Sequence, residues 1–126
     1  MSRRIRITAG TVKAVADLND TDTAKAIWEA LPINASGNLW GDEIYFSIPL
    51  KLELEKGQEL VNAGDLGYWP QGNAFCIFFG PTPLSRGDEI RPASAVTVFG
   101  RVISDISLFR QVASGTAITI DRIDKE

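Results

Sequence analysis

The chain has 126 residues, of which 44% are hydrophobic and 23% are charged, and its formal net charge at pH 7 is −3. These values predict one globular domain spanning residues 1–126. They exclude a membrane-spanning helix, because no apolar run approaches about 18 residues. The basic residues are scattered, which argues against a nucleic-acid partner.

The sequence contains no histidine and one cysteine, Cys76. Without histidine, Ser-His-Asp catalysis, Cys-His catalysis and imidazole-based zinc sites are excluded as usually built. An acid–base enzyme would need a carboxylate or lysine with a displaced pKa. A lone cysteine forms no intrachain disulfide, and no apolar run follows the basic start at residues 1–6, so we expect a cytoplasmic location. No cofactor or metal ion is expected.

The first third of the chain predicts two strands and a helix. Apolar residues alternate over residues 4–9 and 11–18, which indicates two strands. Asn19 and Asp20 then supply N-cap oxygens ahead of apolar residues at helical spacing. We therefore predict an amphipathic helix at residues 21–31, ended by Pro32.

The middle of the chain predicts a loop or short strand at residues 34–41, then a strand at 42–50, then an exposed loop at 51–59. In the strand, alternation directs Ile44, Phe46 and Ile48 to one face. Glu43 and Tyr45 share the opposite, outward face.

An aromatic block follows, in which apolar runs at residues 66–69 and 74–79 flank a tight connection at 70–73. This pattern is typical of adjacent antiparallel strands. Phe75, Ile77 and Phe79 share the inner face of the second strand, and Cys76 and Phe78 share its outer face. Two interpretations of the outer face stay open: it packs in the core under a helix, or it lines an apolar groove.

The last third of the chain predicts a long loop at residues 81–95, which is a length often associated with function. A strand at residues 94–104 is interrupted by Gly100, which indicates a bulge or a tight barrel bend. A short helix at 106–113 and a strand at 116–123 complete the chain. So many short strands in a small chain favour a closed barrel, which leaves no exposed sheet edge.

Three segments resemble the atypical cyclophilin-like proteins of bacteria and archaea. They are Trp-Gly-Asp-Glu-Ile-Tyr-Phe at residues 40–46, Gly-Asp-Leu-Gly-Tyr-Trp-Pro at 64–70 and Ile-Phe-Phe-Gly-Pro-Thr-Pro at 77–83. The resemblance covers nearly the whole chain. It implies an all-β fold: a closed eight-stranded antiparallel barrel with one capping helix and one short helix.

The resemblance also implies a possible activity, because true cyclophilins are peptidyl-prolyl isomerases. An arginine on one of their strands hydrogen-bonds near the prolyl amide. The matching strand here, residues 44–48, holds neither arginine nor histidine. Arg86, Arg91 and Arg101 are the candidates to replace it from elsewhere. A weak isomerase is therefore the second functional hypothesis, and whether the chain is an enzyme stays open.

The first hypothesis is a binding domain for a peptide or small molecule, working as a monomer or homodimer. We expect an apolar groove on the outer barrel wall, lined by Tyr45, Trp69 and Phe78, with the 81–95 loop at its rim. Arg86 and Arg91 would supply polar anchors. Structural roles compete for the two amphipathic rings, since Tyr45 suits a cross-strand pair and Trp69 suits a barrel anchor.

Three acidic residues, Asp42, Glu43 and Asp65, lie beside glycines and have two interpretations. Paired carboxylates perform acid–base chemistry when one pKa is raised. The alternative for Asp65 is a turn cap, in which the carboxylate bonds the backbone two residues further on.

Overall fold

The computed structural model describes residues 3–123. Met1 and Ser2 of the basic start lie outside the described residues. The elements, in chain order, are β1 (Arg3–Ala9), β2 (Val12–Leu18), α1 (Asp22–Ala30), β3 (Ile33–Ser36), β4 (Asn38–Leu39), β5 (Glu43–Ser47), β6 (Asp65–Trp69), the 3₁₀ helix η1 (Pro70–Gly72), β7 (Ala74–Phe78), β8 (Thr97–Val102), the 3₁₀ helix η2 (Ile106–Gln111) and β9 (Ala117–Arg122).

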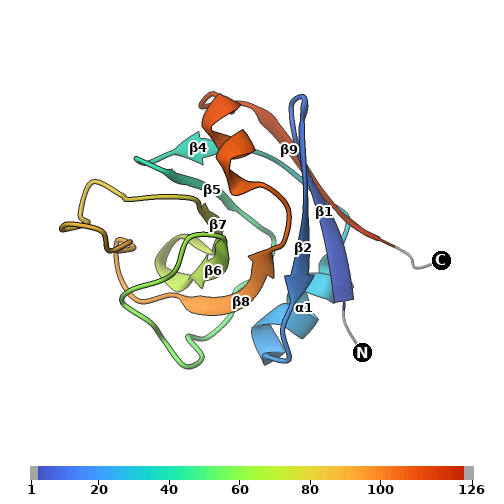
Figure 1. Cartoon of the computed structure of the whole chain (residues 1–126). Coiled ribbons are helices and arrows are strands. Elements are labelled where there is room, and N and C mark those ends of the chain that lie inside the picture. Colours follow the sequence, from blue (N-terminus) through green and yellow to red (C-terminus); the bar gives the residue numbers. More distant parts are fainter. Residues whose placement is uncertain (1–2, 124–126) are drawn as a thin grey trace.

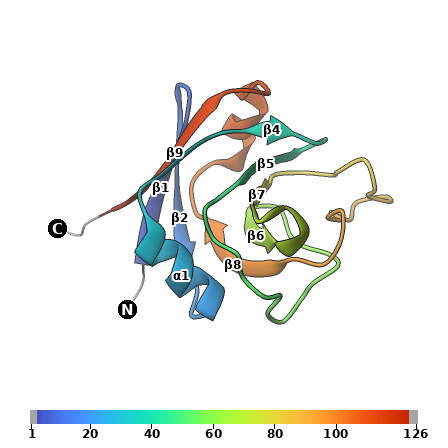
Figure 2. The same cartoon turned by 180° about the vertical axis from the view of Figure 1, so that it is seen from behind.

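The strands form one antiparallel sheet in the order β3-β9-β1-β2-β8-β6-β7-β5-β4, which curls into a nearly closed barrel (Figures 1 and 2). The two edge strands, β3 and β4, follow each other in the chain and are separated by Gly37. The predicted barrel is confirmed, and within residues 3–123 it has nine strands in place of eight. The additional strand is β4, because Asn38 and Leu39 pair with Tyr45 and Ile44.

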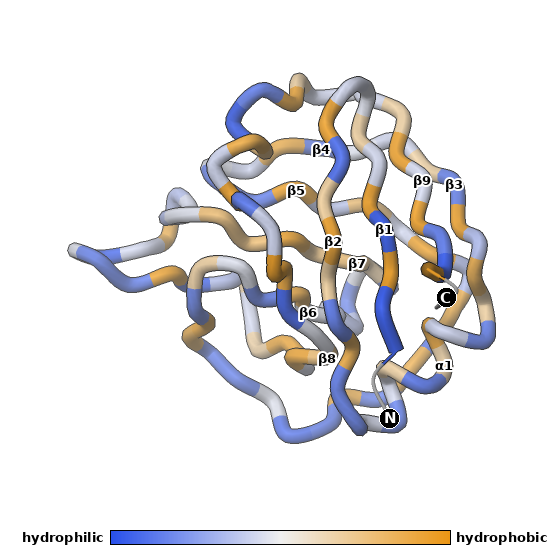
Figure 3. The backbone as a smooth tube through the Cα atoms, turned by 45° about the vertical axis from the view of Figure 1, so that its right-hand side comes forward, coloured by the Kyte–Doolittle hydropathy of each residue, from blue (hydrophilic) through white to orange (hydrophobic). Residues whose placement is uncertain are grey.

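Alternating side chains produce the barrel because one face of each strand is buried. Ile5, Ile7 and Ala9 of β1 are almost completely buried, and the residues between them are more exposed. Figure 3 shows the corresponding alternation of hydrophobic and hydrophilic residues along β1. The period of two therefore fixes which face of the sheet is inside.

Aromatic rings fill the barrel interior. The Phe75 ring stacks on Phe46 and meets Phe99 edge-on, with centroid distances of 5.0 Å in both pairs. The buried Tyr68 donates its hydroxyl proton to the carbonyl of Leu50 at 2.8 Å, so its polar end is satisfied. Phe75 and Ile77 point inward, as predicted.

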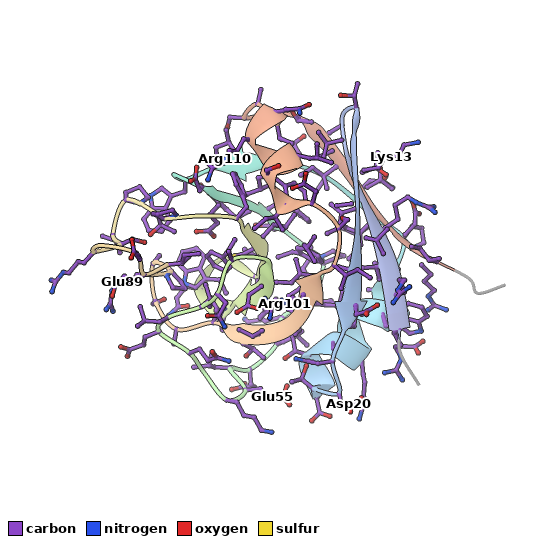
Figure 4. The ribbon with its side chains drawn as sticks, viewed as in Figure 1. Lys13, Asp20, Glu55, Glu89, Arg101 and Arg110 are labelled. Carbon is purple, nitrogen blue, oxygen red and sulfur yellow. The ribbon has the colours of Figure 1, made fainter. Side chains whose placement is uncertain are left out.

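Helices lie at opposite ends of the barrel (Figure 1). The cap of α1 is Thr21 and not the predicted Asn19 or Asp20, since the Thr21 hydroxyl oxygen accepts from the backbone N–H of Ala24 at 3.0 Å. The Asn19 side chain instead accepts from the Thr21 N–H at 3.1 Å. The Glu55 carboxylate adds two bonds from the N–H groups of Asp22 and Thr23, at 3.1 and 3.0 Å, and Figure 4 places it beside α1. The helix ends at Ala30, within the predicted range.

The second predicted helix is η2, a 3₁₀ helix that ends at Gln111. It covers the other end of the barrel with Phe109, which is fully buried. No helix within residues 3–123 combines the length and the apolar character needed to cross a membrane.

The predicted irregularity at Gly100 is confirmed. Leu66 pairs with Gly100 while Gly67 pairs with Val98, so Phe99 is the extra residue of a bulge in β8. A Cβ atom at Gly100 would lie 2.7 Å from the carbonyl oxygen of Asp17 on β2. Glycine is therefore required where the two strand backbones approach each other.

Candidate functional site

The outer face of β7 is covered by loops. Residues 48–64 and 80–96 are joined there by isolated bridges between Gln58 and Val96 and between Val61 and Ile90. Side chains of these loops and of β7 form a second apolar cluster outside the barrel core, made of Val61, Ala74, Cys76, Phe78, Ile90 and Val96. The outer face of β7 is therefore packed, which was one of the two interpretations from the sequence. Loops cover it, however, and not a helix.

A cavity of about 260 Å³ opens beside this cluster. Its lining is mostly apolar and includes three large aromatic side chains. The residues are Trp40, Glu43, Tyr45, Trp69, Cys76, Pro92, Ala93 and Val96. We call this space the aromatic cavity. Strands β5 and β7 and the loop of residues 80–96, which can be followed in Figure 1, supply six of these lining residues: Glu43, Tyr45, Cys76, Pro92, Ala93 and Val96.

A tight turn positions Glu43 at the start of β5. Gly41 adopts a φ of 61°, a left-handed conformation that favours glycine. The Trp40 N–H donates to the Glu43 carbonyl at 2.9 Å, and the Phe79 N–H donates to the Asp42 carbonyl at 2.9 Å. These bonds fix the turn against β7, and the Glu43 side chain enters the wall of the aromatic cavity.

The Glu43 carboxyl is buried, with 5% of the residue exposed. Burial raises the pKa of Glu43 from 4.5 to about 7, and a hydrogen bond from the Cys76 thiol opposes part of that rise. Burial and the nearby Glu43 carboxylate raise the pKa of the Cys76 thiol well above its usual value. Near neutral pH the carboxyl therefore exists in both protonation states, and the thiol stays protonated.

Other carboxylates near the aromatic cavity are paired with arginines. Arg110 donates to Asp42, the residue before Glu43, at 2.9 Å, and Arg91 donates to Glu89 at 2.9 Å. Figure 4 labels Arg110 on η2 and Glu89 on the loop of residues 80–96. Within residues 3–123, no lysine or arginine forms an ion pair with Glu43.

Two of the predicted site residues, Tyr45 and Trp69, lie in the aromatic cavity. Trp69 is held in place because its indole N–H donates to the Ser94 hydroxyl at 2.6 Å. Phe78 is 0% exposed and lies in the cluster behind the cavity, so it is not available for ligand contact. This placement corrects the expected lining, because the loops cover β7 at that position.

The two predicted arginine anchors lie outside the lining of the aromatic cavity. Arg86 is exposed on the loop. Arg91 lines a neighbouring hollow with Glu59 and Leu84. Asp65 caps a turn, but its carboxylate accepts from the Asn62 backbone N–H at 2.8 Å, three residues earlier, and not from the backbone two residues further on as predicted.

Sequence reasoning noted Glu43 as acidic but placed it on an open outer face. The strand register contained the missing information. Glu43 pairs with Phe78, and Tyr45 pairs with Cys76, so Glu43 shares its face with two apolar side chains. A strand face that carries Cys76 and Phe78 needs a cover, and any cover of those residues also buries Glu43.

The comparisons with known proteins identify the family. The model of the cyclophilin-like family matches residues 3–121. The chain therefore belongs to the cyclophilin-like family. No curated protein matches it.

Two solved structures are similar to it. The solution structure of a hypothetical protein from Archaeoglobus fulgidus is 39% identical, with a TM-score of 0.83, over 97% of this chain and 95% of that one. The structure of McbB in complex with tryptophan is 16% identical, with a TM-score of 0.76. That match covers 97% of this chain and 45% of McbB, and at this identity it shows a shared fold.

Proposed function

We propose that this protein is a binding domain whose ligand occupies the aromatic cavity. The observation that carries the proposal is the combination of large apolar walls with one buried carboxyl group in a space of about 260 Å³. Small-molecule sites have this composition, since apolar walls provide affinity and a few polar groups orient the ligand. The volume is below the roughly 300–1,000 Å³ of drug-sized sites. A small molecule or one side chain of a peptide is the matching size.

Two features support a preformed site. The Ser94 bond fixes the Trp69 indole, and the bridges between Gln58 and Val96 hold the covering loops against each other. A wall that is already ordered loses little entropy when a ligand binds. The tryptophan complex of McbB, which shares the fold, shows a ligand bound by that protein.

Nuclear magnetic resonance of the tryptophan indole N–H groups tests the proposal. Trp40 and Trp69 line the aromatic cavity, whereas Trp28 lies on α1 with Arg122 above its ring, 4.6 Å from the centroid. A screen of small apolar probes, including indole, is expected to move the Trp40 and Trp69 signals and leave Trp28 unchanged. If no probe moves Trp40 or Trp69 at millimolar concentration, the binding-site proposal fails.

Variants separate binding from stability. Tyr45→Ala is expected to weaken probe binding, because it removes part of the cavity wall. Ile103→Ala is the control, since Ile103 is 49% exposed and is not among the cavity residues. If both variants bind the probes as tightly as the wild type, the probes do not bind in the aromatic cavity.

Prolyl isomerisation stays an untested alternative. Within residues 3–123, no arginine lines the aromatic cavity, so no donor there corresponds to the arginine of true cyclophilins. A proline-peptide exchange assay decides this question directly. A cytoplasmic location is also part of the proposal, supported by the single buried thiol, Cys76.

A further inference from the structure

The aromatic cavity contains one carboxyl group whose charge has no counterpart in the described part of the chain. Glu43 is 5% exposed, and its hydrogen-bond partner is the neutral thiol of Cys76. Buried charges in proteins are normally paired with an opposite charge or coordinate a metal ion. Within residues 3–123 no cation fills this role, so a positively charged ligand would complete the site.

Two arginines near Glu43 form ion pairs with other carboxylates and not with Glu43. Arg110 reaches the adjacent carboxylate of Asp42 at 2.9 Å, and Arg91 is held by Glu89. Arg91 precedes the lining residue Pro92 and Arg110 pairs with Asp42, the residue before Glu43, yet neither arginine lines the cavity. The cavity is consequently left with a net negative character whenever Glu43 is ionised.

The aromatic walls of the cavity also favour a positively charged ligand. The faces of tryptophan and tyrosine rings attract cations through the ring quadrupole, and several such rings together recognise quaternary ammonium groups. Trp40, Tyr45 and Trp69 all line this cavity. Because the Trp69 N–H donates to Ser94, the polar edge of that indole is already satisfied and its apolar surface is left for the ligand.

From these observations we infer that the ligand of the aromatic cavity carries an alkylammonium group, held between the aromatic rings and the Glu43 carboxylate. The inference rests on the proposed function and specifies its ligand class. An anion would meet an unpaired carboxylate, and a neutral ligand would leave that carboxylate buried without a partner. A metal ion is disfavoured, since no group of three Asp, Glu or Cys side chains within residues 3–123 is arranged to hold one.

A matched pair of probes tests the role of charge. Choline and 3,3-dimethylbutan-1-ol have nearly the same shape, and they differ in a positive nitrogen that replaces a neutral carbon. Titrations followed by the Trp40 and Trp69 indole signals, with Trp28 as the internal reference, give both affinities. We expect choline to bind on the order of tenfold more tightly than its isostere.

The variant Glu43→Gln keeps the shape of the side chain and removes its charge. In this variant, choline is expected to lose its advantage over the neutral isostere. Glu29→Gln is the matched control, because Glu29 is exposed on α1 and is absent from the cavity. It is expected to leave both affinities unchanged.

The outcomes separate the two proposals. If the isostere binds the wild type as tightly as choline, the cavity is a ligand site but the alkylammonium inference is overturned. If choline keeps its advantage in Glu43→Gln, the carboxylate is not the partner and the inference is also overturned. If neither these probes nor the neutral aromatic probes move Trp40 or Trp69, the proposed function itself fails.

Affinity against pH provides an independent readout. The other titratable groups that line the cavity are Tyr45 on β5 and Cys76 on β7, and the remaining lining residues carry no charge. Choline affinity is expected to rise from about pH 6 to about pH 8 as Glu43 loses its proton. A flat profile in the wild type would contradict the inference.

The same chemistry can be presented by a free amine or by a lysine side chain of a peptide. Nα-acetyl-lysine methylamide and its trimethylated form, titrated beside choline, distinguish the two sources. Tighter binding of a lysine derivative indicates a peptide side chain, and tighter binding of choline indicates a free small molecule. Failure of all three cations to outperform the neutral isostere overturns the inference.

Discussion

The stability of this protein is expected to fall as pH rises through neutrality, and Glu43 is the cause. The pKa of Glu43 is raised from 4.5 to about 7 because the carboxyl is buried. In the unfolded chain the carboxyl titrates near its ordinary value. Between these two pKa values the folded state holds a proton that the unfolded state has released, so raising the pH favours unfolding.

The size of the effect follows from the shift. One pKa unit corresponds to about 1.36 kcal/mol, so a rise from 4.5 to about 7 gives a loss of about 3 kcal/mol in unfolding free energy between about pH 4 and pH 8. Glu43→Gln carries no titratable group at this position. Compared with the wild type, its unfolding free energy should therefore gain about 3 kcal/mol on going from about pH 4 to pH 8.

Urea unfolding at a series of pH values, followed by tryptophan fluorescence, measures this difference. Carboxylates with lowered pKa values, such as Glu55, Glu89 and Asp105, lose stabilising contacts in acid. They are present in both proteins and cancel in the comparison. Glu29→Gln serves as the control and should follow the wild-type profile. Parallel profiles for wild type and Glu43→Gln would refute the argument that Glu43 is buried with a raised pKa.

Three further variants test the fold, each by urea unfolding against the wild type. Phe75→Ala is expected to cost about 3–5 kcal/mol, because it removes the ring between Phe46 and Phe99. Thr21→Ala should cost about 1 kcal/mol by removing the cap of α1. Gly100→Ala is expected to cost about 1–3 kcal/mol, since its Cβ would collide with the Asp17 carbonyl oxygen. If a variant is as stable as the wild type, the contact proposed for that residue does not contribute to stability.

Much of the barrel is readable from the sequence because one inward face imposes a period of two. The alternation at Ile5 and Ile7 predicts β1, and the polar residues Asn19 and Asp20 predict where α1 begins, although the cap itself is Thr21. Gly100 marks the bulge in β8. Residues 38–39 were ambiguous, since a two-residue strand has no alternation to detect.

The candidate site is less readable because loops without periodicity build its cover. The aromatic residues Tyr45 and Trp69 are predicted from their amphipathic character and lie in the cavity wall. The sequence leaves open whether the face of Phe78 is packed or lines a groove, and it places Glu43 on an outward face, since nothing in the local sequence indicates that Val61 and Ile90 pair above them. Long-range contacts of this kind depend on the folded chain, and so they determine burial that the strand pattern leaves open.

Strand β7 has two apolar faces, and each belongs to a different cluster. Phe75 and Ile77 contribute to the barrel, whereas Cys76 and Phe78 contribute to the layer beneath the covering loops. Substitutions at successive positions of β7 should therefore affect the two clusters in turn. Changes at the odd positions should alter the barrel core, and changes at Cys76 and Phe78 should alter the loop-covered cluster beside the aromatic cavity.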